Sequence, residues 1–242
     1  MMGILRDLYH RLPAPPSTNY NPRPSEAPDP FAGLPEDAVV YDVGAKRVRE
    51  YDRWRLPEGA RITRIDIDST TEPDIVADAH DLYMLPDASA DCVVCVCVLE
   101  HCRNPHQVVA ELFRILKPGG CLFLGVPFLF PYHADPHDHW RITYTGIEHL
   151  CQRFEKIGSG FDRGPASCMA ELNARYLAIL FSFNSTTLYG FLLDLFKWAL
   201  FWTKYLDRFT IRHPMRHIIH AGVWFFGRKP EEPAEDKAKP KR

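Results

Sequence analysis

One strand–helix–strand pattern in the middle of the chain constrains the fold more than any other feature. Residues 91–98 are almost continuously apolar, which is typical of a strand buried on both faces of a sheet. Asn104 and Pro105 then fit the cap and the first position of a helix. The apolar face of this helix comprises Val108, Val109, Leu112, Ile115 and Leu116. Lys-Pro-Gly-Gly at 117–120 ends it and an apolar run follows at 121–126, so the pattern predicts two parallel strands joined by a helical crossover.

Five further segments predicted as strands indicate that this unit belongs to a larger sheet. Three of these segments precede it, at 39–43, 61–67 and 74–77, and two follow it, at 154–160 and 220–228. Strands that alternate with helices favour parallel pairing and right-handed crossovers. We therefore predict an α/β fold with a Rossmann-like, seven-stranded, mostly parallel sheet and a helical insert before the last strand.

The two ends of the chain differ in composition from its middle. Residues 1–36 are predicted to contain a short amphipathic helix at 3–12, followed by a proline-rich arm that is extended or lies on the surface. Residues 37–228 are predicted to form one α/β domain, with the helical insert at about 165–218. Residues 229–242 are charged and contain proline, which predicts a disordered tail.

The charge balance and the first residues narrow the class of protein. The chain has 29 Lys and Arg against 31 Asp and Glu, so no bulk basicity indicates a nucleic-acid partner. Arg6, Asp7 and Arg11 interrupt the apolar stretch that a secretory signal needs. Seven cysteines, an odd number, then favour a reducing cytoplasm.

Four cysteines lie close enough in sequence to suggest a metal cluster. Cys92, Cys95 and Cys97 belong to the predicted strand, and Cys102 follows it. Successive side chains of a strand point to opposite faces, so Cys92 points away from Cys95 and Cys97. We therefore interpret these cysteines as small buried hydrophobic residues.

A glycine and an acid stand where an adenosine-containing cofactor would bind. Gly44 follows the first predicted strand, and Asp66 ends the second, where it can accept hydrogen bonds from both ribose hydroxyls. NAD and S-adenosylmethionine (SAM) both fit this arrangement. NAD-binding folds need glycine at three positions of this turn to admit the pyrophosphate, and here those positions hold Gly44, Lys46 and Arg49. SAM has no pyrophosphate, and Lys46 can meet its methionyl carboxylate, so the sequence favours SAM.

Three longer blocks carry a resemblance to a known family. These are DAHDLYMLPDASADCVVC at 78–95, VLEH at 98–101 and ELFRILKPGG at 111–120. Together with Gly44 and Asp66, in this order and spacing, they resemble the class I SAM-dependent methyltransferases of the methyltransferase type 11 group. The family has a second glycine where this chain has a lysine.

The resemblance covers residues 38–150 and implies a role for each matching position. Gly44 would border the methionyl group of SAM, and Asp66 would hold the ribose. Asp78 would bind the adenine amino group, with Ala79 against the ring. The predicted cofactor site comprises Asp42, Gly44, Lys46, Asp66, Ile67, Asp78 and Ala79, together with Leu99 and Glu100 as the floor of the pocket.

The loop after the strand at 121–126 concentrates polar side chains at the edge of the sheet where ligands bind. Its pattern P-x-H-x-x-P-x-D-x-W-R-x-T resembles a subgroup of small bacterial-type methyltransferases, some associated with saccharide or envelope chemistry. The resemblance implies that His133, Asp138 and Arg141 are the catalytic residues on the acceptor side. Three interpretations stay open: an acceptor-binding lid with His133 as general base, a structural Asp138–Arg141 pair, and a metal site. The histidine spacing matches no standard metal site, so we predict no metal ligands.

An aromatic segment at 187–208 stands out in the predicted insert. Its polar residues, Asp194, Lys197, Lys204 and Arg208, form one narrow stripe on a largely apolar helix. Because Asp194 and Lys197 would lie near the middle of a bilayer, we do not expect this helix to span a membrane. Three fates remain: burial on the core or as an acceptor lid, contact with a membrane surface, or contact with a second copy in a homodimer.

These features predict a SAM-dependent methyltransferase. Its acceptor is predicted to be an oxygen atom of a small molecule, a saccharide or a lipid-linked intermediate. One alternative is a catalytically inactive SAM-fold binding or scaffold protein, since Lys46 replaces a family glycine. The other is a nicotinamide-dependent oxidoreductase, which the missing glycines disfavour. The expected location is cytoplasmic, with membrane association open.

Overall fold

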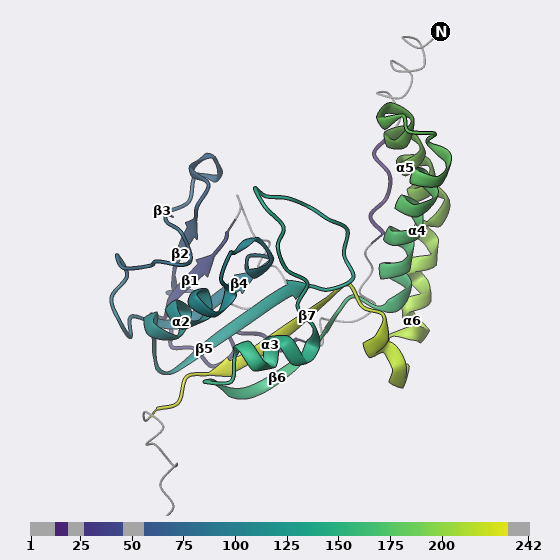
Figure 1. The fold of residues 1–242 in the computed structure, drawn as a ribbon. Helices are drawn as coiled ribbons and strands as arrows, with labels where there is room; N and C mark the ends of the chain where they lie inside the picture. The colour runs from purple at the N-terminus through teal and green to yellow at the C-terminus, as the bar shows by residue number, and fades with distance from the viewer. Residues whose placement is uncertain (1–12, 19–26, 46–55, 232–242) are drawn as a thin grey trace, which may run out of the picture. The chain divides into compact units, whose positions relative to one another are not determined.

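The computed structural model describes residues 13–18, 27–45 and 56–231 of the chain. These fall into two compact units, which we treat separately (Figure 1). The helical unit comprises Met1–Pro24, Leu129–Pro131 and Arg163–Ala221, and the sheet unit comprises Ser25–Phe128, Tyr132–Asp162 and Gly222–Arg242. The amphipathic helix predicted at 3–12 lies outside the described residues.

The sheet unit is built on seven strands. They are β1 (Val39–Val43), β2 (Arg61–Asp66), β3 (Ile75–Val76), β4 (Ala90–Val96), β5 (Leu116–Pro127), β6 (Glu155–Asp162) and β7 (Gly222–Arg228). Their order across the sheet is β3-β2-β1-β4-β5-β7-β6 (Figure 1). The first five strands pair in parallel, whereas β7 is antiparallel to both β5 and β6. The predicted seven-stranded, mostly parallel sheet is confirmed.

Helix α2 (Pro105–Ile115) begins where the sequence predicts, but the prediction that Leu116 lies on its apolar face is wrong: Leu116 is the first residue of β5, where it pairs with Ala90. The side chain of Asn104 accepts a hydrogen bond from the backbone N–H of Gln107, and Pro105 occupies the first turn. At the other end the ammonium group of Lys229 donates to the carbonyls of Phe113 and Leu116, at 2.8 and 2.7 Å. These bonds satisfy carbonyls that the end of a helix leaves without partners. The remaining helices of this unit are η2 (Ser69–Thr71), η3 (Leu99–His101) and α3 (Tyr144–Leu150).

Each face of the sheet is covered by different residues. On one face α2 and α3 pack over the strands through side chains such as Leu112 and Ile147, which are fully buried. On the other face Phe31, from the end of the proline-rich arm, is buried among residues of β1, β4, β5 and β7. Cys92 belongs to this second cluster and Cys95 to the first, as alternation along β4 predicts.

The prediction that Cys97 is a buried residue of the strand is wrong. Strand β4 ends at Val96, and Cys97 is exposed. Its φ of 57° shows that the backbone turns sharply at this point. The turn directs the following residues, Leu99–His101, into η3 instead of extending the strand.

The helical unit contains the insert that was predicted before the last strand. Its helices are α4 (Pro165–Phe181), α5 (Thr186–Leu200), η4 (Phe201–Leu206), α6 (Asp207–Thr210) and η5 (Pro214–Ile218). The aromatic segment 187–208 is therefore one α-helix followed by two short ones. Asp207 caps α4 from a distance, because its two carboxylate oxygens accept from the backbone N–H groups of Ala166 and Ser167 at 2.8 and 2.9 Å. A side chain at Gly164 would overlap that carboxylate, so this position needs glycine.

Helices α4 and α5 run alongside each other in the helical unit (Figure 1). The rings of Phe181 and Phe196 lie 6.1 Å apart, and Lys197 pairs with Glu171 at 3.4 Å. In α5, all of whose residues are described, none is fully buried. None of the described helices is both long and apolar enough to cross a membrane.

Candidate cofactor and acceptor site

The site begins at the centre of the sheet, where β1 lies between β2 and β4. Ligands of open α/β sheets bind beside the carboxyl ends of the strands at such a switch point. Gly44 follows β1 with a φ of 76°, and its backbone N–H donates to the carbonyl of Ile65 at 2.7 Å. A side chain at Gly44 would overlap that of Val98, directly before η3. The glycine therefore brings the turn after β1 close to the residues that follow β4.

Asp66 lies at the end of β2, next to this turn. Asp66 is 7% exposed, and its Oδ1 atom accepts a hydrogen bond from the backbone N–H of Asp68 at 2.9 Å. The backbone N–H of Ala77 donates to the Asp66 carbonyl at 3.0 Å, so the chain leaving β3 runs past this acid. Ile67 is exposed beside it, whereas Asp42 is fully buried within β1. Asp66 is thus fixed at the sheet edge where a ribose would lie.

Asp78 is held by a histidine that the sequence analysis did not select. The Nδ1 atom of His80 lies 2.6 Å from Asp78 Oδ1, and the backbone N–H of His80 donates to the same oxygen. The Nε2 atom of His80 accepts from the backbone N–H of Asn104 at 3.2 Å, which links this loop to the start of α2. Burial raises the pKa of the Asp78 carboxyl, but the hydrogen bonds from His80 outweigh it and hold that pKa below its ordinary value. Ala79 is buried next to it.

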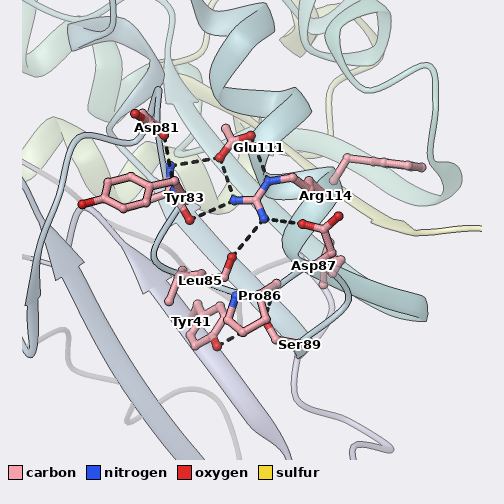
Figure 2. A network of polar contacts seen from close by, with 12 residues as sticks. Tyr41, Asp81, Tyr83, Leu85, Pro86, Asp87, Ser89, Glu111 and Arg114 are labelled. Carbon is pink, nitrogen blue, oxygen red and sulfur yellow. Dashed lines mark hydrogen bonds and ion pairs between the residues drawn. The ribbon is translucent and has the colours of Figure 1, made fainter.

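A single arginine fixes the loop that carries these residues (Figure 2). The guanidinium group of Arg114 donates to both carboxylate oxygens of Glu111, to Asp87, and to the carbonyls of Leu82 and Leu85. Glu111 in turn accepts from the backbone N–H of Leu82 at 2.9 Å. Side chains on α2 thus satisfy the backbone of the loop between β3 and β4. The two separate blocks of the sequence at 78–95 and 111–120 are thus joined by direct contacts.

Helix η3 places a carboxylate at the floor of the site. Leu99 and Glu100 are both fully buried. Among the described residues, neither carboxylate oxygen of Glu100 has a conventional hydrogen-bond partner. Burial raises the pKa of Glu100 to about 7, and the negative charge of Asp138 adds to the effect.

Two imidazoles face this carboxylate. The Nε2 atoms of His101 and His133 each lie 3.7 Å from Glu100 Oε1, and the two rings meet edge to face at 5.0 Å. The Nδ1 atom of His101 lies 2.5 Å from the carbonyl oxygen of His137. The backbone N–H groups of His139 and Trp140 donate to the Glu100 carbonyl at 2.7 and 3.2 Å. The loop after β5 therefore folds back onto η3 and carries His133 to Glu100.

Asp138 and Arg141 hold His133 in this position. The two side chains form a double hydrogen bond, with distances of 2.5 and 2.6 Å. Asp138 Oδ2 also accepts from the backbone N–H of His133 at 2.8 Å and lies 3.4 Å from its Nδ1 atom. The guanidinium of Arg141 holds the pKa of Asp138 well below its usual range. The Asp138–Arg141 pair therefore orders the loop and orients His133 at the same time.

The comparisons with known proteins agree with this architecture. A protein-family profile described as a methyltransferase domain matches residues 42–124, from β1 through β5. That range contains the glycine turn, the acid after β2 and the η3 floor described above. Residues 42–124 thus match a methyltransferase domain, which supports the predicted class I SAM-dependent methyltransferase. The predicted cofactor, SAM, is the one this kind of domain uses.

Curated relatives of this chain are named for different acceptor atoms. A human thiol S-methyltransferase is 38% identical over 73 residues, which is 30% of this chain and 28% of the relative. A dimethylglycine N-methyltransferase from Parasynechococcus marenigrum is 31% identical over 109 residues, or 39% of each chain. A ubiquinone biosynthesis O-methyltransferase from Xanthomonas oryzae is 35% identical over 71 residues, 28% of this chain and 30% of the relative. The matched segment thus spans well under half the length of these relatives.

Solved structures share the fold of this chain. The (4+2)-cyclase SpnF has a TM-score of 0.54 and 16% identity, covering 96% of this chain and 93% of that one. A phosphoethanolamine N-methyltransferase from Haemonchus contortus, bound to SAM, has a TM-score of 0.52 and 14% identity, covering 83% of this chain and 50% of that one. At these identities the likeness shows the fold alone.

The predicted residues of the methyltransferase separate into two groups. The cofactor group (Asp42, Gly44, Asp66, Ile67, Asp78, Ala79) lies on or directly after β1, β2 and β3. The acceptor group of His133, Asp138 and Arg141 meets Glu100, which was predicted only as pocket floor. His101 was missed, although the block at 98–101 ends on it. Lys46 lies outside the described residues.

Proposed function

We propose that this methyltransferase transfers a methyl group from SAM to an oxygen atom of a small molecule, a saccharide or a lipid-linked intermediate. The observation that carries the proposal is the convergence of Glu100, His101 and His133 at the carboxyl end of β4. The residues predicted to hold SAM lie at the ends of the neighbouring strands. An acceptor bound over η3 would therefore meet both groups.

The acceptor atom is inferred from what each kind of nucleophile needs. A thiol with a pKa near 8.5 is already partly ionised at neutral pH, and a neutral amine attacks through its own lone pair. A hydroxyl group must lose its proton as it attacks, so it depends most on a positioned base. Two imidazole nitrogens and a carboxylate oxygen within 4.8 Å of one another supply such groups. This favours oxygen over the sulfur and nitrogen acceptors named for the relatives.

Each protein group has a distinct part in the transfer. SAM supplies an electrophilic methyl group, and its sulfur keeps the bonding electrons when the carbon–sulfur bond breaks. Asp138 faces Nδ1 of His133, so a proton on Nδ1 leaves the Nε2 lone pair directed toward Glu100. His133 then takes the proton of the acceptor hydroxyl as the new carbon–oxygen bond forms. Arg141 keeps Asp138 ionised and in place.

Replacement of His133 tests the proposal. We expect His133→Ala to lower turnover by roughly 10²–10⁴-fold, the usual contribution of a positioned base, with SAM affinity nearly unchanged. Turnover would be measured as transfer of labelled methyl groups to a panel of sugars and phenols, with a thiol and an amine probe beside them. The matched control is His139→Ala, which removes an exposed ring of the same loop but keeps its backbone hydrogen bond. Normal turnover in His133→Ala, or transfer confined to the thiol or amine probe, would contradict the proposal.

We also propose that the enzyme is cytoplasmic and contacts a membrane surface through the α4–α5 hairpin. Residues 176–193, which form the end of α4, the turn and the start of α5, contain no Asp, Glu, Lys, Arg or His. Large apolar side chains are exposed there: Phe183 is 84% exposed, Ile179 64% and Phe191 42%. A contiguous exposed apolar surface of this kind is typical of an interaction site.

Charges at the opposite end of the hairpin favour a lipid surface over a protein partner. Glu171 pairs with Arg175 and Lys197 and accepts a hydrogen bond from the hydroxyl of Thr18. The chain then continues with a set of exposed aromatic and basic residues: Trp198, Trp202, Tyr205, Arg208, Phe209 and Arg212. An apolar end followed by aromatic and basic residues matches the order of hydrocarbon, interface and anionic headgroups. Such contact would suit a lipid-linked acceptor.

Vesicle binding tests the membrane contact. The protein should cosediment with phosphatidylcholine vesicles, and more strongly when they contain phosphatidylglycerol. Phe183→Asp should abolish binding, whereas Tyr83→Asp, at an exposed aromatic of the sheet unit, should not. If Phe183→Asp instead converts a dimer to a monomer and the wild type ignores vesicles, the hairpin contacts a second copy and the proposal is wrong.

A further inference from the structure

We propose that Glu100, His101 and His133 form a binding site for a divalent transition-metal ion, with Zn²⁺ as the best match. The three side chains come from η3 and from the loop after β5. None of the sequence motifs assigns a metal, and the histidine spacing within the loop fits no standard site. The inference rests on the geometry of these residues, and only the role of the ion rests on the proposed function.

The ligand atoms already lie near each other. One oxygen, Glu100 Oε1, is 3.7 Å from Nε2 of both His101 and His133, and the three atoms are all within 4.8 Å of one another. In tetrahedral zinc sites, bonds of about 2.0–2.2 Å place the ligand atoms roughly 3.3–3.6 Å apart. Small rotations of the two imidazole rings would close the difference. Two histidines, one carboxylate and an open position form the ligand set of several catalytic zinc sites.

The outer contacts of both histidines orient them as metal ligands. The Nδ1 atom of His101 lies 2.5 Å from the carbonyl oxygen of His137, which can only accept, so Nδ1 carries the proton and Nε2 presents its lone pair. The Nδ1 atom of His133 faces the carboxylate of Asp138 at 3.4 Å, which favours the same tautomer. A ring N–H held by a carbonyl or a carboxylate is the usual arrangement behind metal-bound histidines.

Glu100 supplies an independent observation. Its side chain is fully buried, and neither oxygen has a conventional hydrogen-bond partner among the described residues. A buried carboxylate without partners is costly, because burial removes its hydration. A cation bound at Oε1 would satisfy it, and the backbone bonds from His139 and Trp140 to the Glu100 carbonyl hold the residue in place. The two rings thus converge on a buried carboxylate whose oxygens have no conventional hydrogen-bond partner among the described residues.

A metal here would deepen the proposed function. Three protein ligands leave at least one coordination position open, on the side where the acceptor would bind. A hydroxyl group bound at that position would lose its proton more readily. With the ion bound, the Nε2 lone pair of His133 would be a ligand and no longer the base, so the proton of the metal-bound hydroxyl would leave to water and the ion would activate the acceptor oxygen.

Metal content and affinity test the site on the purified full-length chain. After chelation and dialysis, calorimetric titration should show one Zn²⁺ bound per chain, with much weaker binding of Mg²⁺. We expect Glu100→Gln and His133→Ala each to weaken Zn²⁺ binding at least tenfold. His139→Ala is the matched control in the same loop and should bind as the wild type does. If Glu100→Gln does not fold, His101→Asn replaces it.

The absorption spectrum of the Co²⁺-substituted protein tests whether cysteines are among the ligands. The Co²⁺-substituted protein should show visible absorption bands of a nitrogen- and oxygen-ligated site, without the near-ultraviolet band of a cobalt–thiolate bond. A thiolate band, the absence of stoichiometric Zn²⁺ binding, or wild-type affinity in His133→Ala would overturn the inference. Because these measurements need no acceptor, they can fail while the His133 dependence of methyl transfer stands, and the reverse.

Discussion

At the scale of single residues, Asp66 is the acid on which the cofactor assignment depends. It is almost buried, and its Oδ1 atom accepts from the backbone N–H of Asp68. We predict that Asp66→Ala weakens SAM binding by about 1–3 kcal/mol, the range for hydrogen bonds to a charged group. Calorimetric titration of SAM measures this, with circular dichroism to show that the variant is folded. Asp66→Asn keeps the shape of the side chain, and its affinity for SAM should lie between those of the wild type and Asp66→Ala. Unchanged affinity in folded Asp66→Ala would remove the ribose assignment.

Sequence reasoning works for residues whose role depends on local order along the chain. Gly44 and Asp66 follow strands, so strand patterns were enough to place them beside each other. His101 was not predicted because its partner, His133, comes from another loop 32 positions later. Only the folded loop brings the two ring centroids to within 5.0 Å of each other. Cys97 was misplaced because its φ of 57° ends the strand, and an apolar run does not reveal such a turn.

At the scale of elements, local signals predicted the start of α2 but not that of α4. Asn104 and Pro105 are adjacent to the helix they begin, whereas α4 is capped by Asp207, 41 positions after Ala166. Strand β5 starts at Leu116 and not at 121 as predicted, because Leu116 pairs with Ala90 before a register shift in the β4–β5 ladder. Glycines and a proline at 118–120 conceal this pairing in the sequence.

The Arg114 network gives a prediction for the loop between β3 and β4. Hydrogen bonds from Arg114 hold the pKa of Glu111 below its ordinary value of 4.5. A depressed carboxyl pKa contributes stability that is present above the unfolded-state pKa and is lost as pH falls through the folded-state pKa. We expect Glu111→Gln to lower the free energy of unfolding by about 1–2 kcal/mol at pH 7. The difference in unfolding free energy between wild type and Glu111→Gln should narrow as pH falls below the ordinary glutamate pKa of 4.5.

Urea unfolding at several pH values measures this dependence. Glu58→Gln, at an exposed glutamate, is the matched control and should change stability little at any pH. A Glu111→Gln penalty that stays constant from neutral to acidic pH would show that the network stabilises the loop through shape and not through charge.

At the scale of the whole molecule, the two units have different surfaces. The sheet unit carries the cofactor residues and the Glu100–His101–His133 cluster, whereas the helical unit carries the uncharged hairpin end at 176–193. The family resemblance pointed to the cofactor residues of the sheet unit because its motifs describe cofactor binding. It left three fates open for the aromatic segment, since an apolar helix pattern is the same for a core, a membrane or a partner surface.

The central claim is that this chain binds SAM at the carboxyl ends of β1 and β2. Calorimetric titration of the wild-type protein with SAM, S-adenosylhomocysteine and NAD tests it most directly. We predict one site per chain for SAM and for S-adenosylhomocysteine, lost or weakened in Asp66→Ala, and no binding of NAD. Binding of NAD in place of SAM, or no heat with either SAM or S-adenosylhomocysteine, would contradict the account.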